Sequence, residues 1–127
     1  MIKTDPQTWT DKRHRDGVAA EQRAADMLVA HGYTVLEQRY RFHRHDVDLV
    51  ARRGNIVVFV EVKARWTRRF GAAVETVRTG KQRELVRAAS AWLQRHGRQG
   101  DVARFDVVAI QAGQLEWFQS AFRPLWR

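Results

Sequence analysis

The sequence predicts an α/β domain in which helices flank a central mixed β-sheet. Two segments with helical periodicity lie before and after a strand hairpin, whose turn is marked by Gly54-Asn55. The second strand of this hairpin is apolar at every position from Val57 to Val60. A strand that is apolar on both faces is typical of a sheet with both faces covered, so we expect helices to pack on it.

The chain is expected to form one globular domain. It has 127 residues, of which 44% are hydrophobic, and this is enough to bury a core. Residues 1–13 are polar without a sustained period, so we expect a flexible N-terminal tail there and a single domain over residues 14–127. The absence of cysteine excludes disulfides, thiolate nucleophiles and zinc–thiolate sites.

The first element is expected to be a helix that begins near Asp16 and ends at Gly32, a residue suited to a helix C-terminus. Its apolar positions fall near one stripe: Val18, Ala24, Ala25, Leu28 and Val29. An extended segment follows from Tyr33 to about Tyr40. A basic stretch then leads into the hairpin.

The hairpin consists of two predicted strands, residues 46–51 and 56–63. A Gly-Asn pair favours a two-residue loop, and that loop places Asp48 directly opposite Glu61. Two opposed carboxylates weaken a sheet unless a positive charge lies between them. A divalent metal ion is the obvious candidate for that charge.

Lys63 is the third charged residue of this arrangement. Because side chains alternate along a strand, Lys63 shares a face with Glu61 and is expected opposite Asp46. Magnesium is usually held by one or two carboxylates and keeps positions for water and a substrate phosphate. Asp48 and Glu61 supply such a pair, and Lys63 could orient the water or stabilise charge developing on the phosphate. The alternative is a solvated cross-strand ion pair, which is unexpected on strands that are otherwise strongly apolar.

The rest of the chain predicts one helix and two strands. We expect a loop over residues 65–76 and a second helix over residues 79–94, with Thr79 as its N-cap. The apolar stripe of this helix is formed by Leu85, Ala89, Trp92 and Leu93. Residues 102–110 alternate as a strand, and residues 115–118 form a short final strand after a polar turn.

The charge of the chain points to a polyanionic partner. There are 23 Lys and Arg residues against 14 Asp and Glu, which gives a formal net charge of +9. Nucleic acid is the first candidate, and a membrane surface is the rival. The sequence contains no long uncharged apolar run and no signal-peptide pattern, so we expect a soluble cytoplasmic protein without membrane association.

An ordered set of motifs resembles a known family. The motifs are Gly17 to Glu21, His45 to Ala51, Val58 to Arg65, Phe70-Gly71, Lys81 and Arg104 to Val108. Together they resemble the YraN-type family of bacterial proteins, which is similar to the PD-(D/E)xK nucleases and distantly similar to archaeal Holliday junction resolvases. The resemblance runs from about Asp16 to Ala121-Phe122. It implies a restriction-endonuclease-like fold and a metal-dependent endonuclease acting on DNA, with branched or structured DNA among the substrates.

The resemblance also implies roles for individual residues. Asp48 and Glu61 would be ligands of Mg²⁺ or Mn²⁺, Lys63 the catalytic lysine, and Glu21 an additional catalytic acid from the first helix. An acid in the first turn of a helix is, however, also favoured by the helix dipole alone. Lys81 lies in the first turn of the second helix, where a cation is mildly unfavourable. That position indicates a phosphate contact, with a solvated lysine as the alternative.

Four positions depart from the family pattern. The family usually reads Gly-Glu-Ile-Asp-Leu where this chain has His45-Asp46-Val47-Asp48-Leu49, and an Asn is usual where Arg39 stands. The shorter acid leaves the role of Asp46 open. His45 is either a metal or phosphate contact or simply a surface residue.

Basic residues flank the hairpin on both sides, interleaved with aromatic ones. We expect Arg41, Arg44, Arg65 and Arg69, together with Lys81, to contact nucleic acid. A scattered solvated surface is the alternative. The C-terminal aromatic and aliphatic residues are interpreted as packing residues, with a homodimer contact as the alternative: Trp117, Phe118, Phe122, Leu125 and Trp126.

Three functional classes remain at this point. The first is a metal-dependent endonuclease on DNA, and the second is a nucleic-acid-binding protein that keeps the nuclease fold without turnover. The third is an assembly protein whose basic surface meets acidic proteins or ribosomal RNA. Facing carboxylates repel phosphate, so a pure binder has no evident use for Asp48 and Glu61, and their presence favours the endonuclease.

Overall fold

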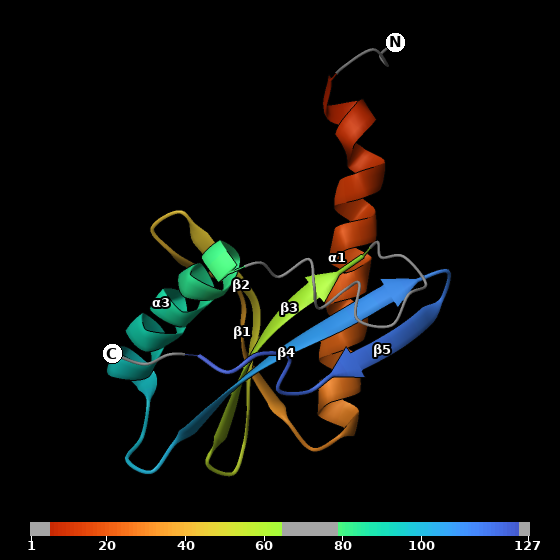
Figure 1. Ribbon diagram of the computed structural model, residues 1–127. Coiled ribbons are helices and arrows are strands. Elements are labelled where there is room, and N and C mark those ends of the chain that lie inside the picture. Colours follow the sequence, from red (N-terminus) through yellow and green to blue (C-terminus); the bar gives the residue numbers. More distant parts are fainter. Residues whose placement is uncertain (1–5, 65–78, 125–127) are drawn as a thin grey trace.

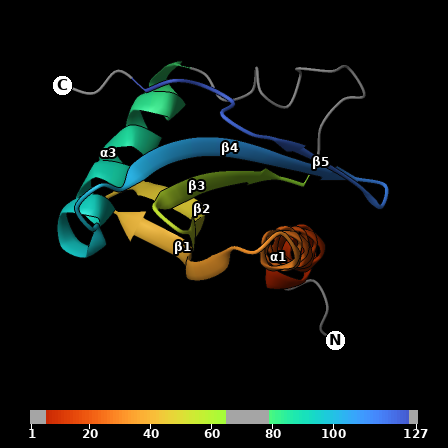
Figure 2. The same ribbon diagram turned by 90° about the horizontal axis from the view of Figure 1, so that it is seen from below.

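Two helices and five strands make up the part of the chain that the structure describes. The computed structural model describes residues 6–64 and 79–124, with side chains for residues 17–64 and 80–124. The elements follow in the order α1 (Pro6–Ala30), β1 (Thr34–Phe42), β2 (His45–Arg53), β3 (Ile56–Lys63), α3 (Thr79–His96), β4 (Val102–Gln111) and β5 (Gln114–Phe118). Helix α1 packs on one face of the sheet and α3 on the other (Figures 1 and 2), so the predicted α/β class with flanking helices is confirmed.

The strands form one sheet in sequence order, β1 to β5. Strands β3 and β4 are parallel, and the other neighbours are antiparallel, which makes the sheet mixed as predicted. Helix α3 lies between β3 and β4 in the chain, as in the crossover that joins parallel strands. The strand before the hairpin is itself paired with β2, an antiparallel contact that the sequence analysis did not predict.

The predicted register of the β2–β3 hairpin is correct. Paired residues run from Arg53–Ile56, next to the turn, to Leu49–Val60. Gly54 has a φ of +60°, which fits its place in a tight two-residue turn. Beyond Leu49 and Val60 the two strands separate, while β2 stays paired with β1 as far as His45 (Figure 1). The expected pairing of Asp46 with Lys63 is therefore absent from this ladder, because the strands have already diverged there.

Helix α1 begins at Pro6, earlier than the predicted start near Asp16. Residues 6–13 are thus helical, whereas their polar sequence predicted no regular element; the flexible tail over residues 1–13 stays a prediction. Proline is favoured at the first position of a helix. The first turns of α1 also need no apolar stripe, because they continue a helix whose later residues pack against the sheet. Figure 1 shows this N-terminal part of α1 extending beyond the sheet. The single domain over residues 14–127 stays a prediction.

The buried face of α1 differs in part from the predicted stripe. Ala24, Ala25 and Leu28 are buried as expected and contact the α1 side of the sheet, but Val18 and Val29 are exposed. The helix ends as predicted, with Gly32 at a φ of +88°. The Tyr33 amide reaches back to the Leu28 carbonyl at 3.0 Å, the bond expected of a glycine-terminated helix.

Helix α3 buries the stripe that its sequence predicts. Leu85, Ala89 and Trp92 are buried in the core on the side of the sheet opposite α1, and Leu93 packs against this core. The Trp92 indole N–H donates to Glu37 of β1 at 3.0 Å, so the helix is tied to the edge strand as well. The side chain of Thr79, the predicted N-cap, lies outside the described residues.

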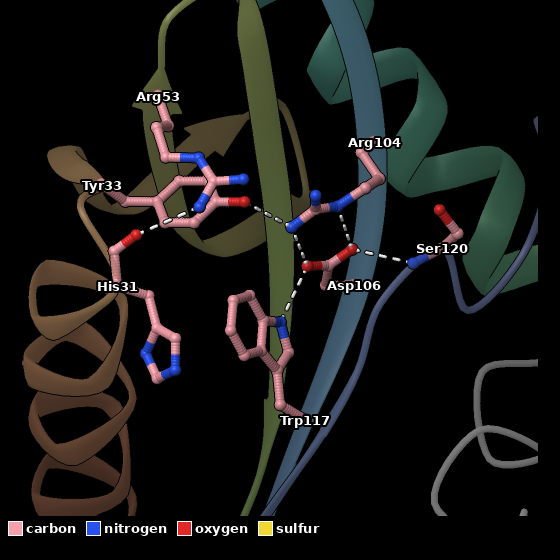
Figure 3. Close-up of polar contacts among 7 residues, drawn as sticks. All are labelled: His31, Tyr33, Arg53, Arg104, Asp106, Trp117 and Ser120. Atoms are coloured by element: carbon pink, nitrogen blue, oxygen red, sulfur yellow. Dashed lines mark hydrogen bonds and ion pairs between the residues drawn. The ribbon is translucent and has the colours of Figure 1, made fainter.

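A buried polar network fixes the C-terminal strand (Figure 3). Asp106 on β4 is almost fully buried and accepts hydrogen bonds from the Arg104 guanidinium, the Trp117 indole and the Ser120 amide. Arg104 also donates to the Tyr33 hydroxyl at 2.9 Å. Both oxygens of the Asp106 carboxylate therefore accept hydrogen bonds, as a buried charge requires.

The interpretation of the C-terminal apolar residues as packing residues is confirmed for those that the structure describes. Trp117 packs against the α1-side core, and Phe118 and Phe122 pack against the α3-side core. The Phe122 ring stacks on Phe105 with centroids 5.0 Å apart. Leu125 and Trp126 lie outside the described residues, and a homodimer contact stays a prediction. Neither α1 nor α3, within the described range, has the length and apolar character needed to cross a membrane.

Candidate functional site

Asp48 and Glu61 lie where β2 and β3 separate. They occupy the positions just beyond the last ladder pair, Leu49–Val60, and the place where the strands part, marked by Asp48 and Glu61, is called the gap below. One oxygen of Asp48, Oδ2, accepts the Val62 backbone N–H at 2.7 Å and so supplies a partner for an amide that the separated strand no longer meets. Glu61 is only 7% exposed. The two acids lie close enough for the charge of Glu61 to act on Asp48, as predicted, although the strand ladder ends one pair before them.

The environment of Asp48 raises its pKa from 3.8 to about 7. Burial is the largest cause, and the negative charge of Glu61 is the next. The hydrogen bond from the Val62 amide acts in the opposite direction because it favours the ionised form. A pKa of about 7 means that Asp48 is partly protonated near neutral pH, and a bound cation would displace that proton.

Two lysines approach Glu61 from different elements. Lys63, on β3, places Nζ 3.2 Å from Glu61 Oε2, and Lys81, on α3, places Nζ 3.9 Å from the same oxygen. The Glu61 contact explains why a cation is tolerated in the first turn of α3, where no acid is present. Lys63 thus lies beside Glu61, as predicted, and Lys81 also approaches it, a contact that the sequence did not predict. The nucleic-acid contact expected of Lys81 stays a prediction.

Glu21 reaches the same region from α1, and its partner is Arg39. Glu21 Oε1 accepts a hydrogen bond from Arg39 Nε at 2.9 Å. The charge of Glu21 also contributes to raising the pKa of Asp48, which places this acid close to the gap. The described contact of Glu21 is therefore an arginine, and its expected role as a catalytic acid stays a prediction.

Arg39 stands opposite Asp48 in the register of β1 and β2. The paired positions on either side are Gln38–Leu49 and Tyr40–Val47. Arg39 has a φ of +55°, in the left-handed region, which side chains other than Gly, Asn and Asp seldom adopt. Asn, which the resemblance implies at this position, would suit this backbone. Arginine accepts the same conformation at some cost in strain.

The donor set fits one divalent ion of the magnesium type. Within residues 17–64 and 80–124, no three side chains of His, Cys, Asp or Glu come close enough together to hold a metal ion. Asp48 and Glu61 form a pair, which is the number of carboxylates that magnesium usually takes from a protein. Among the same residues Asp48 has no basic side chain within 4.0 Å, so its charge is not already neutralised by an ion pair.

The other predicted site residues are less closely tied to the gap. Asp46 is more than half exposed and lies 3.9 Å from Arg41 Nε, and Arg41 and Arg44 are both exposed on the β1–β2 hairpin. The His45 ring approaches Glu84 of α3 at 3.2 Å, a contact that links the start of β2 to that helix. Arg65 and Arg69, which were also predicted to contact nucleic acid, lie outside the described residues together with Phe70-Gly71.

Sequence reasoning missed the part played by Arg39. Its departure from the family pattern was visible, but nothing in the sequence indicated that it would pair with Glu21, which lies 18 positions earlier in the chain. The contact between His45 and Glu84 was missed for the same reason, because it depends on how α3 packs over β2.

Comparison with known proteins identifies relatives across most of the chain. A family model described as "Uncharacterised protein family UPF0102" matches residues 20–110, which include Glu21, Asp48, Glu61 and Lys63. A UPF0102 protein of Symbiobacterium thermophilum is 46% identical over 99 residues, covering 78% of this chain and 84% of that protein. A UPF0102 protein of Halorhodospira halophila is 40% identical over 118 residues, covering 93% of this chain and 95% of that protein.

Proposed function

The chain belongs to the uncharacterised protein family UPF0102, and from the geometry of its own site we propose that it is a divalent-metal-dependent endonuclease that hydrolyses phosphodiester bonds in DNA. The observation that carries the proposal is the meeting of Asp48, Glu61 and Lys63 at the opening between β2 and β3. A buried Glu61 and a half-buried Asp48 beside a lysine, on strands that are otherwise apolar, need a reason, and metal-assisted phosphodiester hydrolysis supplies one.

Each residue has a role in this proposal. A magnesium or manganese ion held by Asp48 and Glu61 would act as a Lewis acid on the scissile phosphate and activate a water molecule. Lys63 Nζ, held 3.2 Å from Glu61, is placed to orient that water and to offset negative charge on the phosphate in the transition state. The Val62 amide fixes Asp48 Oδ2, which leaves the other carboxylate oxygen, Oδ1, for the cation.

The substrate follows from charge and from the resemblance to PD-(D/E)xK nucleases. A net charge of +9 attracts a polyphosphate backbone, and Arg41 and Arg44 are exposed on the hairpin that flanks the gap. The choice of DNA, with branched or structured DNA among the candidates, rests on the resemblance. The proposal includes a restriction-endonuclease-like fold, which is supported by the mixed sheet with a helix on each face.

Nucleic-acid binding without turnover is the second candidate. Lys63 and Lys81 both approach Glu61, and these contacts compensate one of the two carboxylates without any metal. A binder of this kind would keep its affinity for DNA when Asp48 is changed to Asn. A nuclease with Asp48 as a metal ligand would lose cleavage through the same change.

A cleavage assay tests the two candidates. Linear, flapped and four-way DNA are incubated with the protein and Mg²⁺ or Mn²⁺, and the wild type is compared with Lys63→Ala. Arg95→Ala is the matched control, because Arg95 is an exposed cation in the last turn of α3, roughly 20 Å along the helix from Lys81. The proposal expects metal-dependent cleavage by the wild type and the control only. If no substrate is cut and Lys63→Ala is indistinguishable from the wild type, the endonuclease is excluded and the binder is favoured.

A further inference from the structure

Arg39 is held beside the acid pair by a contact from another element. Glu21 on α1 fixes the guanidinium through Nε at 2.9 Å, and the register of β1 and β2 puts Arg39 opposite Asp48. The Arg39 side chain is 47% exposed, while that of Glu21 is only 15% exposed. The ion pair therefore holds the guanidinium through Nε, while about half of the Arg39 side chain stays exposed beside the Asp48 position.

The charges around Arg39 confirm this placement. The hydrogen bond and the charge of Glu21 are the main causes that raise the pKa of Arg39, and the charges of Asp48 and Asp46 contribute further. A guanidinium has five N–H donors, of which the contact with Glu21 uses the one on Nε. The terminal Nη groups form the planar fork that matches two oxygens of a phosphate.

We propose that Arg39 is a phosphate-binding residue of this site and that Glu21 is a positioning residue that holds Arg39 in place. This deepens the proposed endonuclease function and rests on it, because the phosphate concerned is that of a nucleic acid backbone at the gap. The two carboxylates of the gap repel phosphate, and Lys63 and Lys81 are both within 4.0 Å of Glu61. Arg39 adds a cation on the side of Asp48, and the side chain of its own counter-ion, Glu21, is largely covered.

Glu21→Gln distinguishes the proposal from simple electrostatics, because the two predict opposite changes in DNA affinity. Glu21→Gln removes a negative charge near the gap, so simple electrostatics predicts tighter binding of DNA. If Glu21 positions Arg39, the same change frees the guanidinium and weakens binding. Arg39→Asn should fold without difficulty, because Asn accepts the φ of +55° at this position.

The test measures DNA affinity in EDTA, where neither metal nor turnover enters. A fixed duplex and a four-way junction are titrated by fluorescence anisotropy over a range of salt concentrations, after the melting temperature of each variant has been recorded. Arg39→Asn is expected to lower affinity about tenfold and to reduce the slope of log affinity against log salt by about one. Arg95→Asn, which removes the same charge at the far end of α3, is the control and is expected to change affinity less than twofold.

The double variant and metal binding complete the test. We expect Glu21→Gln to weaken DNA binding about threefold, and Glu21→Gln with Arg39→Asn to bind no more weakly than Arg39→Asn alone. Mn²⁺ affinity, measured by calorimetry, is expected to stay unchanged in Glu21→Gln.

Three results would overturn the proposal: an Arg39→Asn variant that behaves like the control, tighter DNA binding by Glu21→Gln, or a marked loss of its Mn²⁺ affinity. A wild type that binds DNA as described but cuts none of it would instead overturn the endonuclease function.

Discussion

Asp48 Oδ2 accepts the Val62 backbone N–H at 2.7 Å at the point where β2 leaves β3. A side chain here takes over the hydrogen bond that a neighbouring strand provides elsewhere in the sheet. The carboxylate is thereby fixed in a buried gap next to Glu61, although burial and the charge of Glu61 raise its pKa to about 7. The fold therefore tolerates an electrostatic cost at this position, and that cost can be measured.

Asp48→Asn is expected to stabilise the metal-free protein at alkaline pH. Because the pKa of Asp48 is raised above 3.8, the folded state binds its proton more tightly than the unfolded state, and stability falls as pH rises from about 4 through about 7. Asn keeps an oxygen for the Val62 amide and gains an N–H for Glu61. We expect a melting temperature higher by ~4 °C at pH 8, which is roughly 1 kcal/mol for a chain of this size, and little change at pH 4.

Asp46→Asn is the matched control, since Asp46 is mostly exposed and only two positions away. Thermal unfolding followed by circular dichroism at several pH values makes the comparison. A pH-independent effect of Asp48→Asn, or an equal gain from Asp46→Asn, would show that the ionised Asp48 carries no such cost.

Divalent metal binding is expected to depend on pH in the range where Asp48 titrates. A metal must displace the proton of Asp48, so the apparent affinity for Mn²⁺ should rise as pH increases from 6 to 8, by up to about tenfold per pH unit below the pKa. Calorimetry in buffers of different ionisation enthalpy would detect the released proton. Asp48→Asn and Glu61→Gln should each remove the binding. An affinity that is the same at pH 6 and pH 8 contradicts this assignment.

The two lysines of the gap should differ in kinetic role. Lys63 is closer to Glu61 than Lys81 is, at 3.2 Å against 3.9 Å, and lies on the same strand. We expect Lys63→Ala to lower kcat about a hundredfold with little change in KM, since it removes charge stabilisation in the transition state. Lys81→Ala should mainly raise KM, as expected of a residue that binds the substrate equally in both states. Steady-state cleavage kinetics separate these effects, and the reverse pattern would exchange the two assignments.

Asp106 is expected to matter for stability alone. Asp106→Ala would leave the Arg104 guanidinium without its carboxylate in a largely buried setting, and it would also remove the acceptor of the Trp117 and Ser120 N–H groups. Removing one partner of a buried ion pair typically costs about 3 kcal/mol or more. Urea unfolding at pH 7 measures the loss, with Asp26→Ala on the exposed face of α1 as control. A loss below about 1 kcal/mol would mean that water replaces the carboxylate.

The hairpin could be predicted from sequence because its information is local. Gly54-Asn55 fixes the turn, and the turn fixes the register as far as Leu49–Val60, directly before Asp48 and Glu61. Alternation then places Lys63 beside Glu61, as the 3.2 Å contact shows. The same reasoning failed for Asp46 and Lys63, because it assumed that the strands stay paired over their whole length.

The contacts that sequence reasoning missed are those set by tertiary packing. The partner of Glu21 depends on where α1 lies over β1, and a left-handed Arg39 contradicts the local preference of arginine. The start of α1 at Pro6 was missed because a helix that continues beyond the sheet needs no apolar pattern. Val29 follows the helical stripe in sequence but is exposed, since the sheet covers only the narrower face formed by Ala24, Ala25 and Leu28.

The position of Mn²⁺ in crystals soaked at pH 8, located by its anomalous scattering, tests the metal site at Asp48 and Glu61 directly. We expect one peak between these two residues, within coordination distance of an oxygen from each. The same soak of Asp48→Asn crystals should give no peak there. The absence of manganese from this gap in the wild type, with Lys63 still paired to Glu61, would contradict the assignment of a metal site.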